Sequence, residues 1–225
     1  MGKPRRLGIF GGTFNPVHLG HLRTAEEIRE ELELDRVWFV PAASPPHKRG
    51  DDLAPARHRM AMVRLAVADN PAFEASALEV RRRGRSYSVD TLRQLRRRFG
   101  SSTELFFVLG LDAFLEIETW KEYEKLFTLC HLVVTTRPPR TQPELRSELF
   151  PVAVRGEFCY EPGQKGFVHR EGKRVLFRSV TALDISASRV RQLLRAGKSV
   201  RYLVPDTVAA YIARHRLYEP RVPRP

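Results

Sequence analysis

Short apolar runs and helical stretches alternate along most of the chain. Apolar runs predict buried strands at residues 7–10, 37–40, 105–109 and 131–136. Between them, apolar residues recur every three to four positions, which predicts helices after His21, after Pro55 and after Ser88. Because strands that alternate with helices form βαβ units, we expect an α/β, Rossmann-like fold with a doubly wound, mostly parallel sheet.

The pattern changes in the last third of the chain. Periodicity is lost from 141 to 179, apart from a run at 174–178 that suggests a strand. It returns with a helix that ends near Gly197 and a last helix that opens at Pro205. We therefore expect a single domain over 1–225, with an irregular excursion at about 141–179 and a C-terminal helical segment at 186–218.

The densest motif follows the first predicted strand, where residues 11–22 are GGTFNPVHLGHL. Gly11 and Gly12 are expected to end the strand by adopting backbone shapes that other residues avoid. The first turn of the next helix leaves backbone N–H groups without helical partners, and the helix dipole favours negative charge there. Strand, glycine loop and helix together predict a phosphate-binding site.

His18 and His21 sharpen this prediction, because their spacing puts both side chains on one side of the first helical turn. Both imidazoles could then donate to one oxyanion, and Gly20 would leave room for a phosphate. An ordinary surface histidine pair remains an alternative. A zinc site is disfavoured, because Cys130 and Cys159 form no Cys-x-x-Cys pair and the chain has no His-Glu-x-x-His.

Further candidate ligands follow other predicted strands, where open α/β sheets bind ligands. The basic loop at 45–49 contains Lys48, and the strand at 105–109 is followed by Gly110 and Asp112. Asp112 could accept a ribose hydroxyl, or it could simply cap the next helix. Trp120 could be a packing residue or a flat platform for an aromatic ring.

Two more helix starts carry hydroxyl groups. Ser88 is the expected N-cap of the helix at 89–99, and Ser186 is the expected N-cap of the helix that contains Ser188 and Arg191. A plain capped helix is the simpler interpretation of each. Arg191 one turn beyond Ser186 nevertheless suggests a second anion site, and two such sites in one chain favour a polyphosphate ligand.

Charge and cysteine content limit the class of protein. The 225 residues include 39 Lys and Arg against 26 Asp and Glu, a net charge of +13. This excess of positive charge suggests nucleic-acid binding. The arginine clusters at 81–83 and 96–98, however, have few aromatic residues among them and are expected to be solvent-exposed faces. Two distant cysteines, a short first apolar run and no long apolar segment lead us to expect a soluble, cytoplasmic protein without disulfides.

The order of these motifs resembles a known family. Gly-Gly-Thr-Phe-Asn-Pro followed by His-Leu-Gly-His resembles the HxGH nucleotidyltransferase superfamily. Almost the whole chain except 141–179 is similar to the bacterial nicotinate-nucleotide adenylyltransferases, through 11–21, 45–48, 86–92, 110–112, Trp120, 185–191 and 202–206. The family commonly has threonine at the position of Ser88, and serine and threonine at Ala187 and Ser188.

The resemblance implies adenylyl transfer from ATP to nicotinate mononucleotide, with Mg²⁺ on the ATP, release of pyrophosphate and no nucleophilic side chain. It implies catalytic roles for His18, His21 and Arg191. The implied ATP-binding residues are Gly11, Gly12, Thr13, Phe14, Gly110, Asp112, Ser186 and Ser188. The implied mononucleotide-binding residues are Lys48, Ser88 and Trp120. Nicotinamide mononucleotide as the acceptor, or a non-catalytic RNA-binding protein, are the alternatives.

Overall fold

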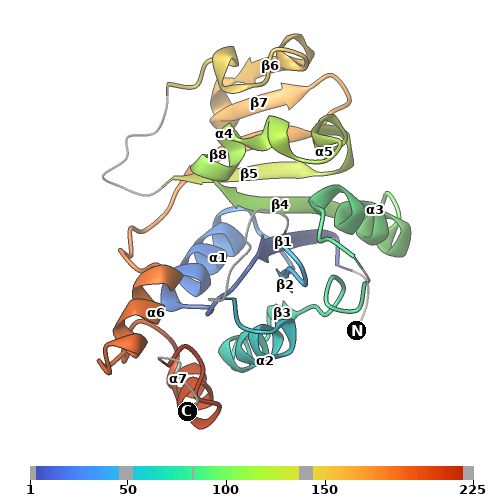
Figure 1. Cartoon of the computed structure of the whole chain (residues 1–225). Coiled ribbons are helices and arrows are strands. Elements are labelled where there is room, and N and C mark those ends of the chain that lie inside the picture. The colour runs from blue at the N-terminus through green and yellow to red at the C-terminus, as the bar shows by residue number, and fades with distance from the viewer. Residues whose placement is uncertain (1–3, 46–52, 83, 137–143, 220–225) are drawn as a thin grey trace.

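A mixed sheet forms the centre of the molecule. The computed structural model describes residues 4–45, 53–82, 84–136 and 144–219. Within these ranges the strand order is β3-β2-β1-β4-β5-β8-β7-β6 (Figure 1). The strands are β1 (Arg6–Gly12), β2 (Arg36–Pro41), β3 (Phe73–Ala75), β4 (Glu104–Gly110), β5 (His131–Thr136), β6 (Phe158–Glu161), β7 (Gly166–His169) and β8 (Arg174–Ser179).

The sheet is parallel from β3 to β8, and only β7 and β6 run antiparallel to their neighbours. In β1, Gly11 lies beside Val40 of β2, and Phe10 lies beside Val108 of β4. This confirms the mostly parallel sheet. Because parallel strands end at one edge, the loops after β1, β2 and β4 meet there.

Helices cover both faces of the sheet (Figure 1). They are α1 (Leu19–Glu31), α2 (Ala56–Ala66), α3 (Ser88–Phe99), α4 (Leu111–Leu115), α5 (Leu126–Leu129), α6 (Ala187–Arg195) and α7 (Asp206–Arg214). Alternate residues of β1 face opposite ways, so Ile9 packs in the core under α3 and α5 and Phe10 packs in the core under α1 and α2. The doubly wound arrangement is confirmed.

The segment at 141–179 differs from the expected irregular excursion. Its first residues, 141–143, are not described, but in the rest of the segment β6, β7 and β8 extend the sheet beyond β5. Phe167 and Phe177 from these strands are buried against Phe150, whose ring lies 4.9 Å from that of Phe167. The run at 174–178 that suggested a strand is β8, whereas β6 and β7 were missed because they are four residues each, too short to show a period.

Within the described ranges, no helix is both long and apolar enough to cross a bilayer.

Candidate active site

A cleft of about 1420 Å³ opens at the carboxyl edge of the sheet. The β1–α1 side contributes Gly11, Gly12, Thr13 and His21 to its wall. The β4 and α3 side contributes Ser88, Gly110, Asp112 and Trp120, and Ser186 lines the cleft from the start of α6. Residues predicted from motifs more than 170 positions apart therefore share one cavity.

Other predicted site residues lie elsewhere. Phe14 and His18 are buried, 2% and 3% exposed, and neither lies in the cleft wall. Arg191 and Ser188 also lie outside the wall. Lys48 falls outside the described residues, so the structure says nothing of its side chain.

Glycine occupies positions 11 and 12 for a different reason from the one expected. Positive φ occurs at Phe14 (48°) and at neither Gly11 nor Gly12, which belong to β1. A Cβ on Gly11 would lie 3.3 Å from the Phe107 ring, and one on Gly12 would lie 3.1 Å from the Phe14 ring. The pair therefore allows close packing of two aromatic rings on the strand rather than an unusual backbone shape.

His18 and His21 begin α1 together. His18 is the N-cap, and its backbone N–H donates to Nδ1 of His21 at 3.2 Å. The two rings stack with centroids 3.6 Å apart. Because Nδ1 of His21 accepts this bond, a neutral His21 carries its proton on Nε2, and Nε2 is then a donor. The predicted placement on one helical turn is confirmed.

The lack of a side chain at Gly20 makes room for the His18 ring rather than for a phosphate. A Cβ at this buried position would lie 3.1 Å from Nδ1 of His18. The room predicted for a ligand is thus occupied by an imidazole ring. A Cβ at position 20 would therefore require the His18 ring to shift by a few tenths of an ångström.

Asn15 joins the β1–α1 loop to three distant segments. Its carbonyl oxygen accepts from Nη1 of Arg191 at 2.9 Å. Its side-chain oxygen accepts from the Tyr218 hydroxyl at 2.8 Å and from the Ala54 backbone N–H at 3.1 Å. Burial raises the pKa of Tyr218, so this hydroxyl stays protonated and remains a donor. Neither Asn15 nor Tyr218 is among the site residues predicted from the sequence.

The buried side chain of Arg59 binds the same loop and two neighbouring segments through hydrogen bonds. Its side chain is 1% exposed, and its guanidinium donates to the carbonyl oxygens of Thr13 (2.8 Å), Ala43 (3.0 Å) and Ala54 (2.9 Å). Burial lowers the pKa of Arg59 from its usual value. Helical spacing contained a signal for it, because residues 59, 62, 63 and 66 form the buried face of α2.

The second predicted anion site is a capped helix start. Ser186 is the N-cap of α6 as expected, and its hydroxyl accepts from the Arg189 backbone N–H at 3.1 Å. Nη2 of Arg191 lies 3.5 Å from the Ser188 hydroxyl. Ser186 reaches the cleft wall from this turn, so α6 presents its N-terminus toward the end of the cleft near β1.

Around β4 and α3, the N-cap expected at Ser88 is wrong, and the alternative that Asp112 caps the next helix is excluded. The N-cap of α3 is Tyr87, so Ser88 is the first helical residue, and the N-cap of α4 is Gly110 rather than Asp112. A Cβ on Gly110 would meet no atom within 4 Å, which shows open space beside the end of β4. Trp120 packs perpendicular to Phe107, with ring centroids 6.3 Å apart, and forms another part of the wall.

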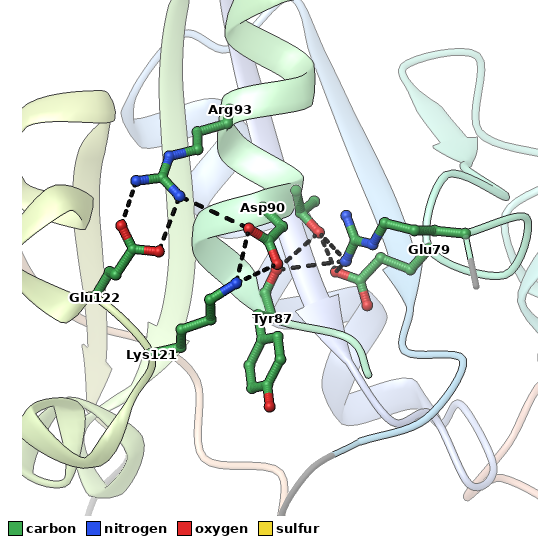
Figure 2. Close-up of polar contacts among 8 residues, drawn as sticks. Glu79, Tyr87, Asp90, Arg93, Lys121 and Glu122 are labelled. Carbon is green, nitrogen blue, oxygen red and sulfur yellow. Dashed lines mark hydrogen bonds and ion pairs between the residues drawn. The ribbon is translucent and has the colours of Figure 1, made fainter. Parts of the chain in front are cut away.

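Paired charges surround the first turn of α3 (Figure 2). Nζ of Lys121 lies 3.1 Å from Asp90, and the Arg93 guanidinium makes two hydrogen bonds to Glu122, at 3.0 and 2.5 Å. On the other side of the turn, Glu79 accepts from the Thr91 hydroxyl at 2.5 Å, and burial raises its pKa. Each acidic group near this turn therefore has a basic or hydroxyl partner.

Side chains that could hold a resident metal do not gather. Among the described residues, no three or more His, Cys, Asp or Glu side chains form such a group. At the β1–α1 end of the cleft, the His21 imidazole can donate from Nε2, which suits an anionic phosphate oxygen. Backbone N–H groups in the first turn of α1 are already bonded, that of Leu19 to the Leu203 carbonyl oxygen and that of His21 to the His18 carbonyl oxygen.

Comparison with known proteins agrees with this geometry. The model of the cytidylyltransferase-like family matches residues 9–193. A protein from Geobacter metallireducens named "Probable nicotinate-nucleotide adenylyltransferase" is 50% identical over 213 residues, which cover 95% of this chain and 98% of the relative. The chain belongs to the nicotinate-nucleotide adenylyltransferase family. A second family member, from Citrifermentans bemidjiense, is 51% identical with the same coverage.

The fold of the family is also found in a solved structure. Plasmodium falciparum nicotinic acid mononucleotide adenylyltransferase, complexed with NaAD, has a TM-score of 0.71 to this chain. The alignment covers 95% of this chain and 97% of that chain at 18% sequence identity. The likeness supports the nucleotidyltransferase fold.

Proposed function

We propose that this chain transfers the adenylyl group of ATP to nicotinate mononucleotide, which forms nicotinate adenine dinucleotide and pyrophosphate. An oxygen of the mononucleotide 5′-phosphate attacks the α-phosphorus of ATP, and the bond from that phosphorus to the β-phosphate oxygen breaks. The observation that carries the proposal is the single cleft that joins the His21 and Ser186 helix starts to Ser88 and Trp120.

The protein's part in this reaction is to position the substrates and to neutralise charge. We assign the ATP phosphates to the start of α1, where Nε2 of His21 can donate to a phosphate oxygen. His18 supports that ring by stacking, and Arg191 supplies positive charge from α6. The adenosine fits the open space beside Gly110 and Asp112.

Two further assignments complete the proposal. Mg²⁺ enters as part of the MgATP substrate, held by phosphate oxygens, which is consistent with the donor set of the cleft. The pyridine ring is assigned to the part of the cleft between Trp120 and the first turn of α3, where Ser88 lies. A flat aromatic wall suits ring stacking, and helix N–H groups suit a ring carboxylate.

Pyrophosphate release by the purified protein with MgATP tests this function. Nicotinate mononucleotide, nicotinamide mononucleotide and phosphopantetheine are compared as acceptors in parallel. We expect kcat/KM to favour nicotinate mononucleotide by about tenfold or more, equivalent to roughly 1.4 kcal/mol. Equal use of both pyridine nucleotides would retain the chemistry but refute the specificity. Salt-sensitive RNA binding without pyrophosphate release would favour the RNA-binding alternative.

A further inference from the structure

An acidic residue of α3, Asp90, lies next to the cleft wall near the place proposed for an anionic ring. Asp90 lies in the first turn of α3, two positions after Ser88. Its carboxylate faces Lys121, whose Nζ lies 3.1 Å from Oδ2 and 3.4 Å from Oδ1. The same ammonium group lies 5.0 Å from the centroid of the Tyr87 ring. Tyr87, Ser88 and Lys121 all contribute to the cleft wall, and the Asp90 carboxylate contacts the Lys121 ammonium group (Figure 2).

Lys121 is the principal counter-charge of Asp90 on the side of the cleft. The other nearby cation is Arg93, at 3.8 Å from Asp90, but its guanidinium makes two hydrogen bonds to Glu122. Without Lys121, the cation left beside the Asp90 carboxylate would be Arg93, which already pairs with Glu122. A negative charge at that place opposes the attraction that the helix N-terminus exerts on an anion.

We propose that Lys121 is a specificity-determining residue, which favours an anionic pyridine mononucleotide over a neutral one by cancelling the Asp90 charge beside the ring site. The inference rests on the proposed function. Nicotinate carries a ring carboxylate, whereas nicotinamide carries a neutral amide at the same ring position. The Coulomb term that Lys121 controls therefore acts on the first ligand and is absent from the second.

A different role for these ion pairs is a mechanical tether that holds the Trp120 segment against α3. Lys121 and Glu122 directly follow Trp120, and they pair with Asp90 and Arg93 of α3. A tether would position Trp120 for both mononucleotides alike, since both present the same six-membered ring to it. The ratio of kcat/KM for the two substrates therefore separates an electrostatic role from a tether. Loss of a tether lowers both values together and leaves the ratio constant.

The experiment measures that ratio, nicotinate over nicotinamide mononucleotide, at low and at physiological salt. The variants are Lys121→Gln, the double variant Lys121→Gln with Asp90→Asn, and Lys125→Gln. Lys125 is an exposed lysine of the same segment outside the cleft wall, so its variant is the matched control for charge. Lys121 is itself exposed, so its replacement is expected to leave the fold intact.

We expect Lys121→Gln to lower the ratio about three- to tenfold, the effect of one unit charge roughly 6 Å away in a partly hydrated cleft. The change should lie mainly in KM for nicotinate mononucleotide. Adding Asp90→Asn should restore most of the ratio, Lys125→Gln should leave it unchanged, and high salt should reduce the difference from the unmodified protein.

A ratio unchanged in Lys121→Gln, or a loss shared equally by both substrates, would overturn the inference while the proposed function stands. Failure of Asp90→Asn to restore the ratio would overturn the charge-cancelling role in the same way. Absence of pyrophosphate release from the unmodified protein with either mononucleotide would instead overturn the proposed function, and this inference with it.

Discussion

Replacing Arg59 with methionine tests whether the β1–α1 loop depends on a buried guanidinium. Methionine fills much of the volume, but it leaves the carbonyl oxygens of Thr13, Ala43 and Ala54 without their present donor. An unsatisfied buried acceptor costs about 1–3 kcal/mol. The side chain is 1% exposed, so water can replace the lost donors only if the loops move.

The net effect is smaller than the sum of three lost bonds, because the variant no longer buries a charge. We expect the free energy of unfolding to fall by about 3–5 kcal/mol. For a chain of this length, that corresponds to a fall in Tm of about 10 °C. Thermal unfolding followed by circular dichroism measures the change.

Arg57→Met is the matched control, since Arg57 is exposed two residues earlier on the same chain segment. Its effect should stay within about 0.5 kcal/mol. Arg59→Lys keeps the charge but cannot reach three carbonyl oxygens in different directions, so it should be destabilised less and show a raised KM for ATP. Equal Tm values for Arg59→Met and Arg57→Met would refute the reasoning.

Three further predictions follow from other contacts. His21→Ala should lower kcat by two or more orders of magnitude, with about 1 kcal/mol of destabilisation from the lost capping bond; turnover near that of the unmodified protein would exclude the assigned role. Tyr218→Phe removes the 2.8 Å bond to Asn15, and we expect kcat/KM to fall about threefold to tenfold. This loss should vanish when Arg191 is already alanine, whereas an additive loss would contradict coupling through Asn15. Burial lowers the pKa of His131 from 6.5 to about 4, so the unfolded chain takes up the proton first as the pH falls. Stability should therefore be lost between pH 6.5 and 4, by about 3 kcal/mol from this residue, and His131→Gln should remove that part of the pH dependence in urea unfolding curves.

The order of elements could be predicted from the sequence because it is a local property. Buried parallel strands are continuous apolar runs, and β2 and β4 show this plainly. Likewise, the geometry of His18 and His21 depends on one helical turn, so their spacing was sufficient to predict it. The two short strands β6 and β7 could not be predicted, because what fixes them is pairing with β8 and not their own pattern.

The residues at which α3 and α4 begin could not be predicted from the sequence for a similar reason. Serine and aspartate are common N-caps, yet Tyr87 and Gly110 hold those positions with extended backbones. The α4 helix directly follows β4, so the end of the sheet decides where the helix begins. The backbone at Ser88 and Asp112 is already helical, and both residues still reach the cleft wall.

By itself, the sequence determined the fold class, the family and the local geometry of the helix starts at His18 and Ser186, since each depends on residues within a few positions of one another. Only the tertiary structure decided which residues share the cleft and which support it from behind. Arg59 and Tyr218 are ordinary residues in their local sequence, and the motif that contains Asn15 does not reveal which groups Asn15 binds. Their contacts exist only because folding brings them to the same loop. A buried polar group is satisfied by whichever partner the fold places beside it, and spacing along the chain does not contain that information.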